Sequence, residues 1–348
     1  MSLKNSNVYT EMSIDDYERV IFCENETAKL KAFIAIHNTK LGPSLGGCRL
    51  WNYENQQQAL TDVLRLSKGM TYKNALAGLK LGGGKSIIWA DSNQEKTLDL
   101  LEAMAEFVET LQGKYIIAED VGINVGDVNA MRQFTEYTAN PIAGNPGPVT
   151  ALGVYAGIKA ACKHKLGVDS LENVKIIIEG VGSVGSNLIR CLMDQNVDIY
   201  AFDINKDKLN SLVNEYNITP LNSIEEIYQE CDVYAPCALG AVINDETLPK
   251  FNCKIVAGAA NNQLLESRHG QALKDKNILY APDYVINAGG VILIDHAQDV
   301  IDVDYEIINS SVLRIGDVLL NIFEESDKTG IATHIIADKI AEDILNGK

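Results

Sequence analysis

The sequence predicts an α/β protein built from two domains, and three observations lead to this expectation. The chain has 348 residues, of which 46% are hydrophobic and 22% charged, so it can bury two separate cores. Short apolar runs of strand length alternate with segments of helical period in both halves of the chain. Three of the eight prolines fall within residues 140–150, which favours a linker or hinge there.

We expect an N-terminal domain at residues 1–144 and a second domain at 145–324, with a cleft between them. A C-terminal helix at about 325–348 is a candidate to pack back on the first domain or between subunits. Ser13, Asp15 and Asp16 can cap a short helix near the start of the chain, within residues 13–26. The other elements expected in the first domain are strands at 31–37, 42–50, 86–90 and 115–118 and helices at 56–68 and 97–111.

A glycine-rich turn organises the second domain. The pattern Gly180-Val-Gly182-Ser-Val-Gly185 lies between an apolar strand expected at 174–179 and a helix expected at 186–194. In this context the first glycine forms the turn, the second lets a pyrophosphate approach, and the third lets helix and strand pack closely. The helix N-terminus would face the pyrophosphate charge. The pattern predicts a Rossmann-type dinucleotide-binding domain.

An acidic residue completes this pattern. Asp203 ends the next expected strand, 197–202, and lies 23 residues after Gly180. Its carboxylate would accept hydrogen bonds from the adenosine ribose and repel a 2′-phosphate, which favours NAD over NADP. The doubly wound sheet would continue with apolar strands at 232–236, 254–259 and 278–281.

The bulk chemistry excludes several classes of partner. A net charge of -17 disfavours binding to nucleic acid or to an anionic membrane. The first 16 residues lack the pattern of a secretory signal, and no apolar run reaches the roughly 18 residues that span a bilayer. The seven cysteines are scattered, odd in number and without a CxxC pair, which indicates reduced thiols and a cytoplasmic protein. The five histidines show no metal-ligand spacing, so no metal site is expected.

Residues 71–85 are the main candidate for chemistry in the first domain. Lys73 and Lys85 lie at its two ends, and three glycines precede Lys85 directly. We expect these glycines to form a sharp turn and Lys85 to lie in an apolar neighbourhood that favours reactivity. A mobile surface loop with a solvated lysine is the alternative. A bound NAD beside a lysine-rich domain suggests hydride transfer, although the residues alone leave the hydride acceptor open.

A series of motifs in order, over about residues 20–300, resembles the glutamate/leucine/phenylalanine/valine dehydrogenase superfamily, most closely its leucine dehydrogenase branch. Besides the glycine pattern, the motifs are Leu45-Gly46-Gly47-Cys48-Arg49, Lys68-Gly69-Met70-Thr71-Tyr72-Lys73, Gly82-Gly83-Gly84-Lys85, Ala118-Glu119-Asp120-Val121-Gly122, Pro148-Val149-Thr150, Ala235-Pro236-Cys237-Ala238-Leu239-Gly240, Ala259-Ala260-Asn261-Asn262-Gln263 and Asn287-Ala288-Gly289-Gly290-Val291. The order and spacing carry more weight than any single motif.

The resemblance implies roles for individual residues. Lys73 would bind the substrate α-carboxylate, and Gly46 and Gly47 would let the backbone approach it. Lys85 would activate the water that attacks the imino acid, for which burial beside the cationic Lys73 would favour its uncharged form. Asp120 would carry protons to and from the substrate nitrogen.

Further positions follow from the same resemblance. The implied cofactor-binding residues are Gly180, Gly182, Val184, Gly185, Asp203, Thr150, Ala238 and Asn261. The implied walls of the side-chain pocket are Leu45, Ala118, Val291 and Ile294. All four walls are apolar, which disfavours glutamate as substrate. Ile294 stands where leucine dehydrogenases commonly have valine, which would tilt the preference towards valine. Lys80 has no assigned role.

The expected function is therefore reversible, NAD-dependent oxidative deamination of leucine, valine and isoleucine to the 2-oxo acid, ammonium and NADH. A valine or phenylalanine dehydrogenase of the same superfamily is the first alternative, and a non-catalytic NAD-binding sensor is the remote one. The resemblance also implies a homo-oligomer, an octamer with a dimer as the alternative. Hinge motion within residues 140–150 is expected to close the cleft before hydride transfer.

Overall fold

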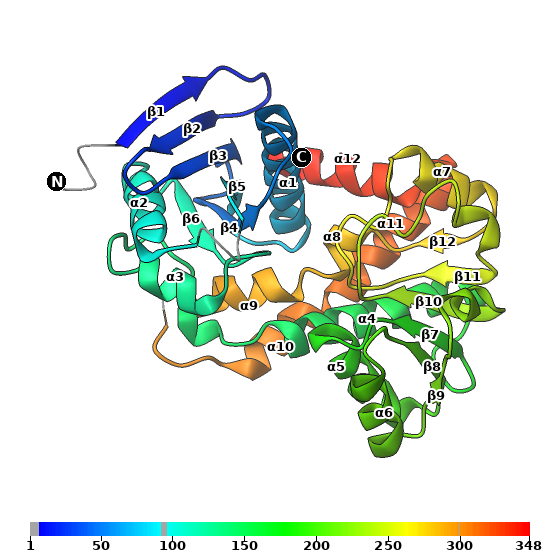
Figure 1. Ribbon diagram of the computed structural model, residues 1–348. Helices are drawn as coiled ribbons and strands as arrows, with labels where there is room; N and C mark the ends of the chain where they lie inside the picture. Colours follow the sequence, from blue (N-terminus) through cyan, green and yellow to red (C-terminus); the bar gives the residue numbers. More distant parts are fainter. Residues whose placement is uncertain (1–6, 92–95, 299) are drawn as a thin grey trace. The chain divides into compact units, whose positions relative to one another are not determined.

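The computed structural model describes residues 7–91, 96–298 and 300–348 (Figure 1). The chain divides into two compact units. The first comprises residues 1–143, 297–301 and 344–348, and the second comprises residues 144–296 and 302–343. The division after Ala143 falls within the proline-rich stretch. Residues 1–6, part of the segment in which no secretory signal is expected, lie outside the described ranges.

The first unit contains a six-stranded mixed sheet in the order β1-β2-β3-β5-β4-β6. Its strands are β1 (Asn7–Met12), β2 (Arg19–Asn25), β3 (Leu30–Asn38), β4 (Ser44–Trp51), β5 (Gly82–Trp89) and β6 (Tyr115–Ala118). Strands β1, β2, β3 and β5 pair antiparallel, whereas β5, β4 and β6 pair parallel. The carboxyl ends of the three parallel strands therefore lie at one edge of the sheet.

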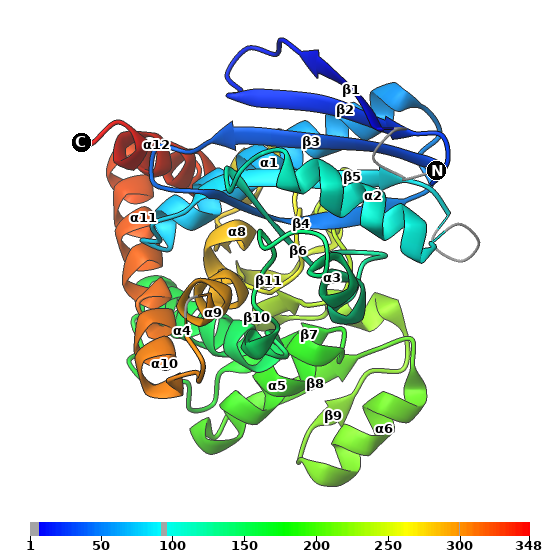
Figure 2. The same ribbon diagram turned by 90° about the vertical axis from the view of Figure 1, so that its left-hand side faces the viewer.

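Helices cover both faces of this sheet. They are α1 (Gln56–Leu76), α2 (Leu98–Glu109) and α3 (Val125–Met131). Figure 2 shows α1 on one side of the sheet and α2 and α3 on the other. The alternation along β3 sends Phe33 and Ala35 into the core beside α1, and Ala32 and Ile34 into the core that holds α2 and α3. Burial on both faces explains the almost uninterrupted apolar run of β3.

The second unit contains a six-stranded, all-parallel sheet in the order β9-β8-β7-β10-β11-β12. Its strands are β7 (Lys175–Glu179), β8 (Asp198–Phe202), β9 (Thr219–Pro220), β10 (Cys231–Pro236), β11 (Cys253–Val256) and β12 (Leu279–Tyr280). The strand order reverses between β7 and β10, which is the doubly wound arrangement of dinucleotide-binding folds. The predicted two-domain α/β fold is confirmed.

Nine helices of the second unit connect and cover these strands in the described part of the chain. They are α4 (Gly147–Leu166), α5 (Ser183–Leu192), α6 (Lys206–Glu215), α7 (Arg268–Asp275), α8 (Asp283–Ile286), α9 (Gly289–Ala297), α10 (Tyr305–Leu313), α11 (Ile315–Thr329) and α12 (Thr333–Leu345). Helix α12 belongs to the second unit up to Asp343, and residues 344–348 are grouped with the first. No helix among the described residues is long and apolar enough to cross a membrane.

Two local expectations are wrong. No helix forms within residues 13–26, because Val20, Ile21 and Phe22 belong to β2, which pairs with β3 over its whole length. The glycines at 82–84 form no turn, because they are the first residues of β5. A Cβ atom at Gly83 would lie 2.0 Å from the backbone nitrogen of Thr71, so this glycine lets helix α1 pack directly on the strand.

Candidate functional site

Lys85 and Asp120 meet in the first unit. Lys85 lies on β5 and is 6% exposed, and Asp120 lies two residues after the end of β6. The Lys85 ammonium nitrogen is 2.9 Å from Oδ2 of Asp120. Strands β5 and β6 flank β4 in the parallel part of the sheet, which brings residues 35 positions apart into contact.

Arg49 on β4 joins the same carboxylate. Its Nε lies 3.0 Å from Oδ2 of Asp120, the oxygen that also contacts Lys85. The other end of the guanidinium donates to Oδ2 of Asp62 on α1 at 2.9 Å, and the Tyr53 hydroxyl donates to that oxygen at 2.7 Å. The site thus contains a chain of alternating charges, Lys85, Asp120, Arg49 and Asp62, which we call the charge cluster.

The charge cluster determines the protonation state of Asp120. Burial alone would raise the pKa of this carboxyl, but Lys85 and Arg49 outweigh burial and hold the pKa below its usual value. Burial raises the pKa of the nearby Cys48 thiol to about 12 and that of the Tyr115 phenol well above its usual value. Both groups are therefore uncharged at neutral pH, and Asp120 is ionised.

Lys73 lies on helix α1, the helix that packs directly on β5. It is half-buried, whereas Lys80 is exposed and lies beyond the C-terminus of α1. Because Thr71 abuts Gly83, the segments that carry Lys73 and Lys85 are held together by backbone contact rather than by long side chains. Binding of a carboxylate by Lys73 stays a prediction, as does the absence of a role for Lys80.

Gly46 and Gly47 are required by the packing of the sheet itself. A Cβ atom at Gly46 would lie 1.8 Å from the carbonyl oxygen of Gly84, and one at Gly47 would lie 2.4 Å from that of Glu119. The buried Tyr115 hydroxyl donates to the Gly46 carbonyl at 2.7 Å and fixes this backbone further. These contacts account for both glycines without a ligand, so their approach to a substrate carboxylate stays a prediction.

In the second unit the three pattern glycines differ in their surroundings. Gly180 has a φ of +91°, which strongly favours glycine. A Cβ atom at Gly185 would lie 1.9 Å from the Gly180 carbonyl oxygen, so this glycine permits the close approach of α5. A Cβ atom at Gly182 would meet nothing within 4 Å. The open position at Gly182 is where a pyrophosphate would come close.

The N-terminus of helix α5, which follows the glycine loop, is suited to bind an anion. Gly182 caps α5 without a side-chain hydrogen bond, and the N-terminus of α4 lies next to it, since a Cβ atom at Gly147 would lie 2.0 Å from the Ser183 hydroxyl. Uncapped helix N-termini present backbone N–H groups and a partial positive charge. The residues of this half therefore fit a dinucleotide.

Asp203 holds the glycine loop. It follows β8, and its Oδ2 accepts a hydrogen bond from the Val181 backbone N–H at 2.7 Å. Its Oδ1 accepts one from the Asn205 backbone N–H at 2.7 Å. The carboxylate thus fixes the loop at the C-terminal edge of the sheet, next to the open position at Gly182.

Of the other expected cofactor residues, Ala238 lies against this loop, and the contacts of Thr150 and Asn261 are with Gly290 and Asn287. A Cβ atom added at Gly180 would lie 2.7 Å from the Ala238 Cβ, and one at Gly290 would lie 3.2 Å from the Thr150 hydroxyl. Asn261 is exposed, and its Oδ1 accepts a hydrogen bond from Asn287 at 2.8 Å. Asn287 also donates to the Ala259 carbonyl at 3.0 Å, so it fixes the Asn261 loop.

The four expected pocket walls are divided between the units. Leu45 and Ala118 are buried on β4 and β6 of the first unit. Val291 and Ile294 are half-buried and lie three residues apart on α9, hence on one face of that helix, in the second unit. A common pocket formed by all four stays a prediction.

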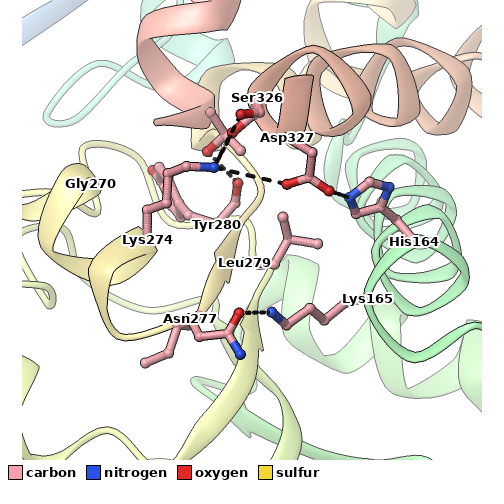
Figure 3. A pocket seen from close by; sticks show the side chains of 11 residues that line it. His164, Lys165, Gly270, Lys274, Asn277, Leu279, Tyr280, Ser326 and Asp327 are labelled. Atoms are coloured by element: carbon pink, nitrogen blue, oxygen red, sulfur yellow. Dashed lines mark hydrogen bonds and ion pairs between the residues drawn. The ribbon is translucent and has the colours of Figure 1, made fainter. Parts of the chain in front are cut away.

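A cavity of about 180 Å³ lies elsewhere in the second unit, between α4, α7, β12 and α11 (Figure 3). Lys274 donates to the Ser326 carbonyl and hydroxyl, His164 contacts Asp327, and Lys165 donates to Asn277. None of the expected site residues lines this cavity. The polar side chains around the cavity bond to one another and to the carbonyl of Ser326 near the end of α11. These bonds hold the surrounding helices and strand together and explain the polar lining without a ligand.

Reasoning from the sequence missed several residues of the site. Arg49 and Asn287 lie within motifs that were recognised, but no role was assigned to either. Asp62 and Tyr53 belong to no motif. The only available signal for Asp62 is a carboxylate on the face of α1 beside the buried Val63. Arg49, which donates to Asp62, comes close to it only when β4 and α1 pack together in the folded protein.

Comparison with known proteins assigns the class. Residues 18–137 match the family described as Glu/Leu/Phe/Val dehydrogenase, dimerisation domain, and residues 201–300 match Glutamate/Leucine/Phenylalanine/Valine dehydrogenase. Together with the doubly wound second unit, these matches define a dehydrogenase with a dinucleotide-binding domain. The chain belongs to the Glu/Leu/Phe/Val dehydrogenase family and is an amino acid dehydrogenase. The resemblance predicted from the motifs is confirmed.

Individual relatives cover nearly the whole chain. Leucine dehydrogenase of Bacillus subtilis is 45% identical over 94% of this chain and 91% of its own length. Valine dehydrogenase of Streptomyces virginiae is 40% identical over 94% of this chain and 93% of its own. The crystal structure of L-tryptophan dehydrogenase from Nostoc punctiforme superposes with a TM-score of 0.85, at 41% identity, over 95% of this chain and 96% of that chain.

Proposed function

We propose that the protein catalyses NAD-dependent, reversible oxidative deamination of branched-chain aliphatic L-amino acids, with leucine as the main substrate and valine and isoleucine as further ones. The observation that carries the proposal is the buried Lys85–Asp120 pair, 2.9 Å apart. An ionised acid against a buried lysine suits proton transfer at a substrate nitrogen and activation of water. A protein that only binds NAD needs neither group.

The apolar residues support an aliphatic substrate. Leu45 and Ala118 are buried close to Gly46, Gly47 and Asp120 in the sheet, and neither supplies a charge for a second carboxylate. The similarity to leucine dehydrogenase of Bacillus subtilis at 45% identity favours leucine. One methylene changes discrimination by only about 1–3 kcal/mol, so valine and isoleucine should react as well.

The reaction divides between three side chains of the first unit. Lys73 holds the α-carboxylate, and Gly46 and Gly47 line its approach. Asp120 takes a proton from the substrate ammonium, which leaves an amine able to form a C=N bond when hydride leaves the α-carbon. Lys85 then removes a proton from the water that adds to this carbon. Asp120 returns a proton to the nitrogen and is then ionised again. The C–N bond breaks as the hydroxyl of the carbinolamine gives its proton to Asp120, so that a C=O bond forms and ammonia and the 2-oxo acid leave.

The second unit would hold the cofactor. Residues proposed to bind NAD are Gly180, Gly182, Val184, Gly185, Asp203, Thr150, Ala238 and Asn261. When bound, the nicotinamide accepts the hydride from the substrate α-carbon. Asp203 selects NAD because a 2′-phosphate would meet its negative charge. Asn287 keeps Asn261 in place through a 2.8 Å hydrogen bond.

The protein is further proposed to act in the cytoplasm as a homo-oligomer, an octamer with a dimer as the alternative. All seven cysteines are free thiols and five of them are buried, as suits a reducing compartment. The family description of residues 18–137 as a dimerisation domain supports self-association. The partners are the amino acid, the 2-oxo acid and ammonium, without nucleic acid or membrane.

The test is NADH formation, followed by absorbance at alkaline pH, with leucine, valine, isoleucine, phenylalanine and tryptophan side by side. We expect the three aliphatic substrates to react best. Lys85→Ala should abolish turnover and leave NADH binding intact, as measured by fluorescence titration. If no aliphatic amino acid yields NADH, the proposal is wrong.

An aromatic substrate is the second candidate. The structure similar to this chain at a TM-score of 0.85 is that of an L-tryptophan dehydrogenase, so the fold accommodates that specificity with 41% identity. Ala118, by resemblance larger than the glycine of phenylalanine-type enzymes, speaks against it. A kcat/KM for phenylalanine or tryptophan above that for leucine would replace the first candidate with this one.

A further inference from the structure

Two cations share one oxygen of Asp120. The Lys85 nitrogen lies 2.9 Å and the Arg49 Nε 3.0 Å from Oδ2. Among the described residues, no side chain is hydrogen-bonded to the second oxygen, Oδ1, and the Val121 backbone N–H also donates a hydrogen bond to this carboxyl. Both cations thus anchor the carboxylate by Oδ2, and Oδ1 carries no side-chain partner.

Arg49 is fixed from its other side. Its guanidinium bridges Asp120 and Asp62, and the Tyr53 hydroxyl shares the Asp62 oxygen. The Arg49 side chain is 20% and the Asp62 side chain 16% exposed, so solvent screens this bridge only partly. Only a planar, forked cation can reach two carboxylates on different elements in this way, and a lysine in its place would reach one.

The other ionisable groups around Lys85 and Asp120 add little charge. Cys48 on β4 and Tyr115 on β6 are neutral at working pH because burial raises the pKa of both. On α3, Asp127 is neutralised by Lys96 at 2.8 Å. Glu119 precedes Asp120 in the chain, and burial raises the pKa of its carboxyl. On α1, the charged residues are Asp62, its partner Arg65 at 3.4 Å, Lys68 and Lys73.

We propose that Arg49 is a positioning residue for the reaction, a permanent counter-cation that holds Asp120 by Oδ2 and so allows Lys85 to give up its proton. The inference rests on the proposed function and deepens it. With Lys85 as its only partner, Asp120 would become an unpaired, largely buried anion whenever Lys85 turned neutral, which is costly. Arg49 stays protonated at every working pH, so it keeps Asp120 paired throughout the cycle.

In the proposed reaction the uncharged form of Lys85 activates water, so the charges beside Lys85 should affect the acid limb of the activity profile. Removal of a neighbouring positive charge favours the charged form of Lys85 and moves this limb to higher pH. Removal of a neighbouring negative charge has the opposite effect.

The experiment compares Arg49→Gln, Arg49→Lys and the matched control Arg65→Gln, which also contacts Asp62 but not Asp120. For Arg49→Gln we expect the acid limb of kcat/KM against pH to move up by about 1 unit, a roughly tenfold loss on that limb that disappears at high pH. Arg49→Lys should restore at least half of the shift. Arg65→Gln should leave the profile unchanged. An unshifted profile in a folded Arg49→Gln protein would overturn the proposal.

A second measurement needs no turnover. The rate of Lys85 acetylation by acetic anhydride, followed against pH by peptide mass spectrometry, reports loss of the Lys85 proton directly. It should shift to higher pH in Arg49→Gln, even if the proposed substrates are wrong. If Arg49→Gln does not fold, Asp62→Asn replaces it, and its acetylation profile should move to lower pH. For Asp62→Asn, an unshifted acetylation profile or a shift to higher pH would contradict the inference.

Discussion

In the second unit most residues expected to hold the dinucleotide come from one stretch, 180–203, whereas the first unit gathers its charge cluster from positions 49, 62, 85 and 120. The glycine loop is shaped by backbone conformation and by contacts between near neighbours in the chain. The charge cluster exists only because β5, β4 and β6 are adjacent and α1 packs against β5 and β4. The difference teaches that the proposed cofactor site is built from one local stretch, whereas the proposed catalytic groups are brought together by the first-unit sheet.

The largest effect should follow from removing the acid of the charge cluster. Asp120→Asn removes the proposed proton carrier and leaves Lys85 without its carboxylate, so kcat/KM should fall by about 10³-fold. Binding of NADH, measured by fluorescence titration, should stay within about twofold, since the residues proposed for it belong to the second unit.

Asp127→Asn is the matched control. Asp127 is also a half-buried carboxylate paired with a lysine, and its side chain completes the capping box of α3. Asp127→Asn should lower the unfolding free energy by about 1 kcal/mol and leave kcat unchanged. A loss of catalysis as large as that of Asp120→Asn would mean that any buried charge of the first unit matters equally.

Two glycine variants sharpen the description of the second unit. Gly185→Ala introduces a Cβ atom 1.9 Å from the Gly180 carbonyl, so we expect a loss of about 2–3 kcal/mol in unfolding free energy, measured by urea denaturation. Gly182→Ala enters open space and should change stability by less than about 1 kcal/mol.

For nucleotide binding we expect the larger effect from Gly182→Ala, whereas for stability we expect it from Gly185→Ala. Gly182→Ala should weaken NADH binding by at least about tenfold although the protein stays stable, because the added methyl group occupies the space where the pyrophosphate approaches. Wild-type affinity in Gly182→Ala would show that the cofactor does not use this opening. An equal loss of stability in both variants would contradict the assigned packing role of Gly185.

The first unit should also respond to acid through His37. This side chain is buried, its Nδ1 lies 2.8 Å from the Thr71 hydroxyl, and burial, with a smaller contribution from Lys68, lowers its pKa to about 4. The unfolded chain binds the proton more strongly, so this contribution to stability is complete above about pH 6.5 and is lost as the pH falls towards 4. We expect a loss of about 2 kcal/mol by pH 5.

His37→Gln tests this expectation. The variant keeps a polar side chain beside Thr71 but has no proton to gain in this range. Urea denaturation at pH 7.5 and pH 5 should show a smaller loss for the variant than for the wild type. Parallel losses in both proteins would mean that other groups cause the acid sensitivity.

The smallest effect is expected at Ala241, in the loop before the Asn261 segment. Ala241 has a φ of +58°, a region that residues other than glycine rarely adopt. Ala241→Gly should relieve this strain and raise unfolding free energy by about 0.5–1 kcal/mol, visible as a higher melting temperature. A lower melting temperature would show that the conformation is held at no cost.

The two units also differ in how far the sequence predicts them. The strand, glycine loop, helix and acid of the second unit are contiguous, so pattern and spacing suffice. In the first unit the motifs name Lys85 and Asp120, but Asp62 belongs to no motif, and its partner Arg49 lies on a strand 13 positions earlier in the chain. The run of glycines at 82–84 predicts a turn from the sequence, because the close contacts that require glycine there, such as that of Gly83 with α1, form only in the folded domain. Polar residues at 13–16 suggested a helix, but pairing with β3 determines the conformation from Arg19 onward.

The bond between Asp203 and the Val181 N–H has a consequence for engineering. A change of coenzyme towards the phosphorylated form would begin with replacement of Asp203, to remove its negative charge. In this chain the same carboxylate holds the glycine loop through two backbone hydrogen bonds of 2.7 Å. A neutral substitute that keeps both acceptors is not available among the common side chains, since an amide supplies one acceptor oxygen. Coenzyme preference and loop order are therefore coupled, and a redesign must supply a new partner for Val181 before it supplies one for the phosphate.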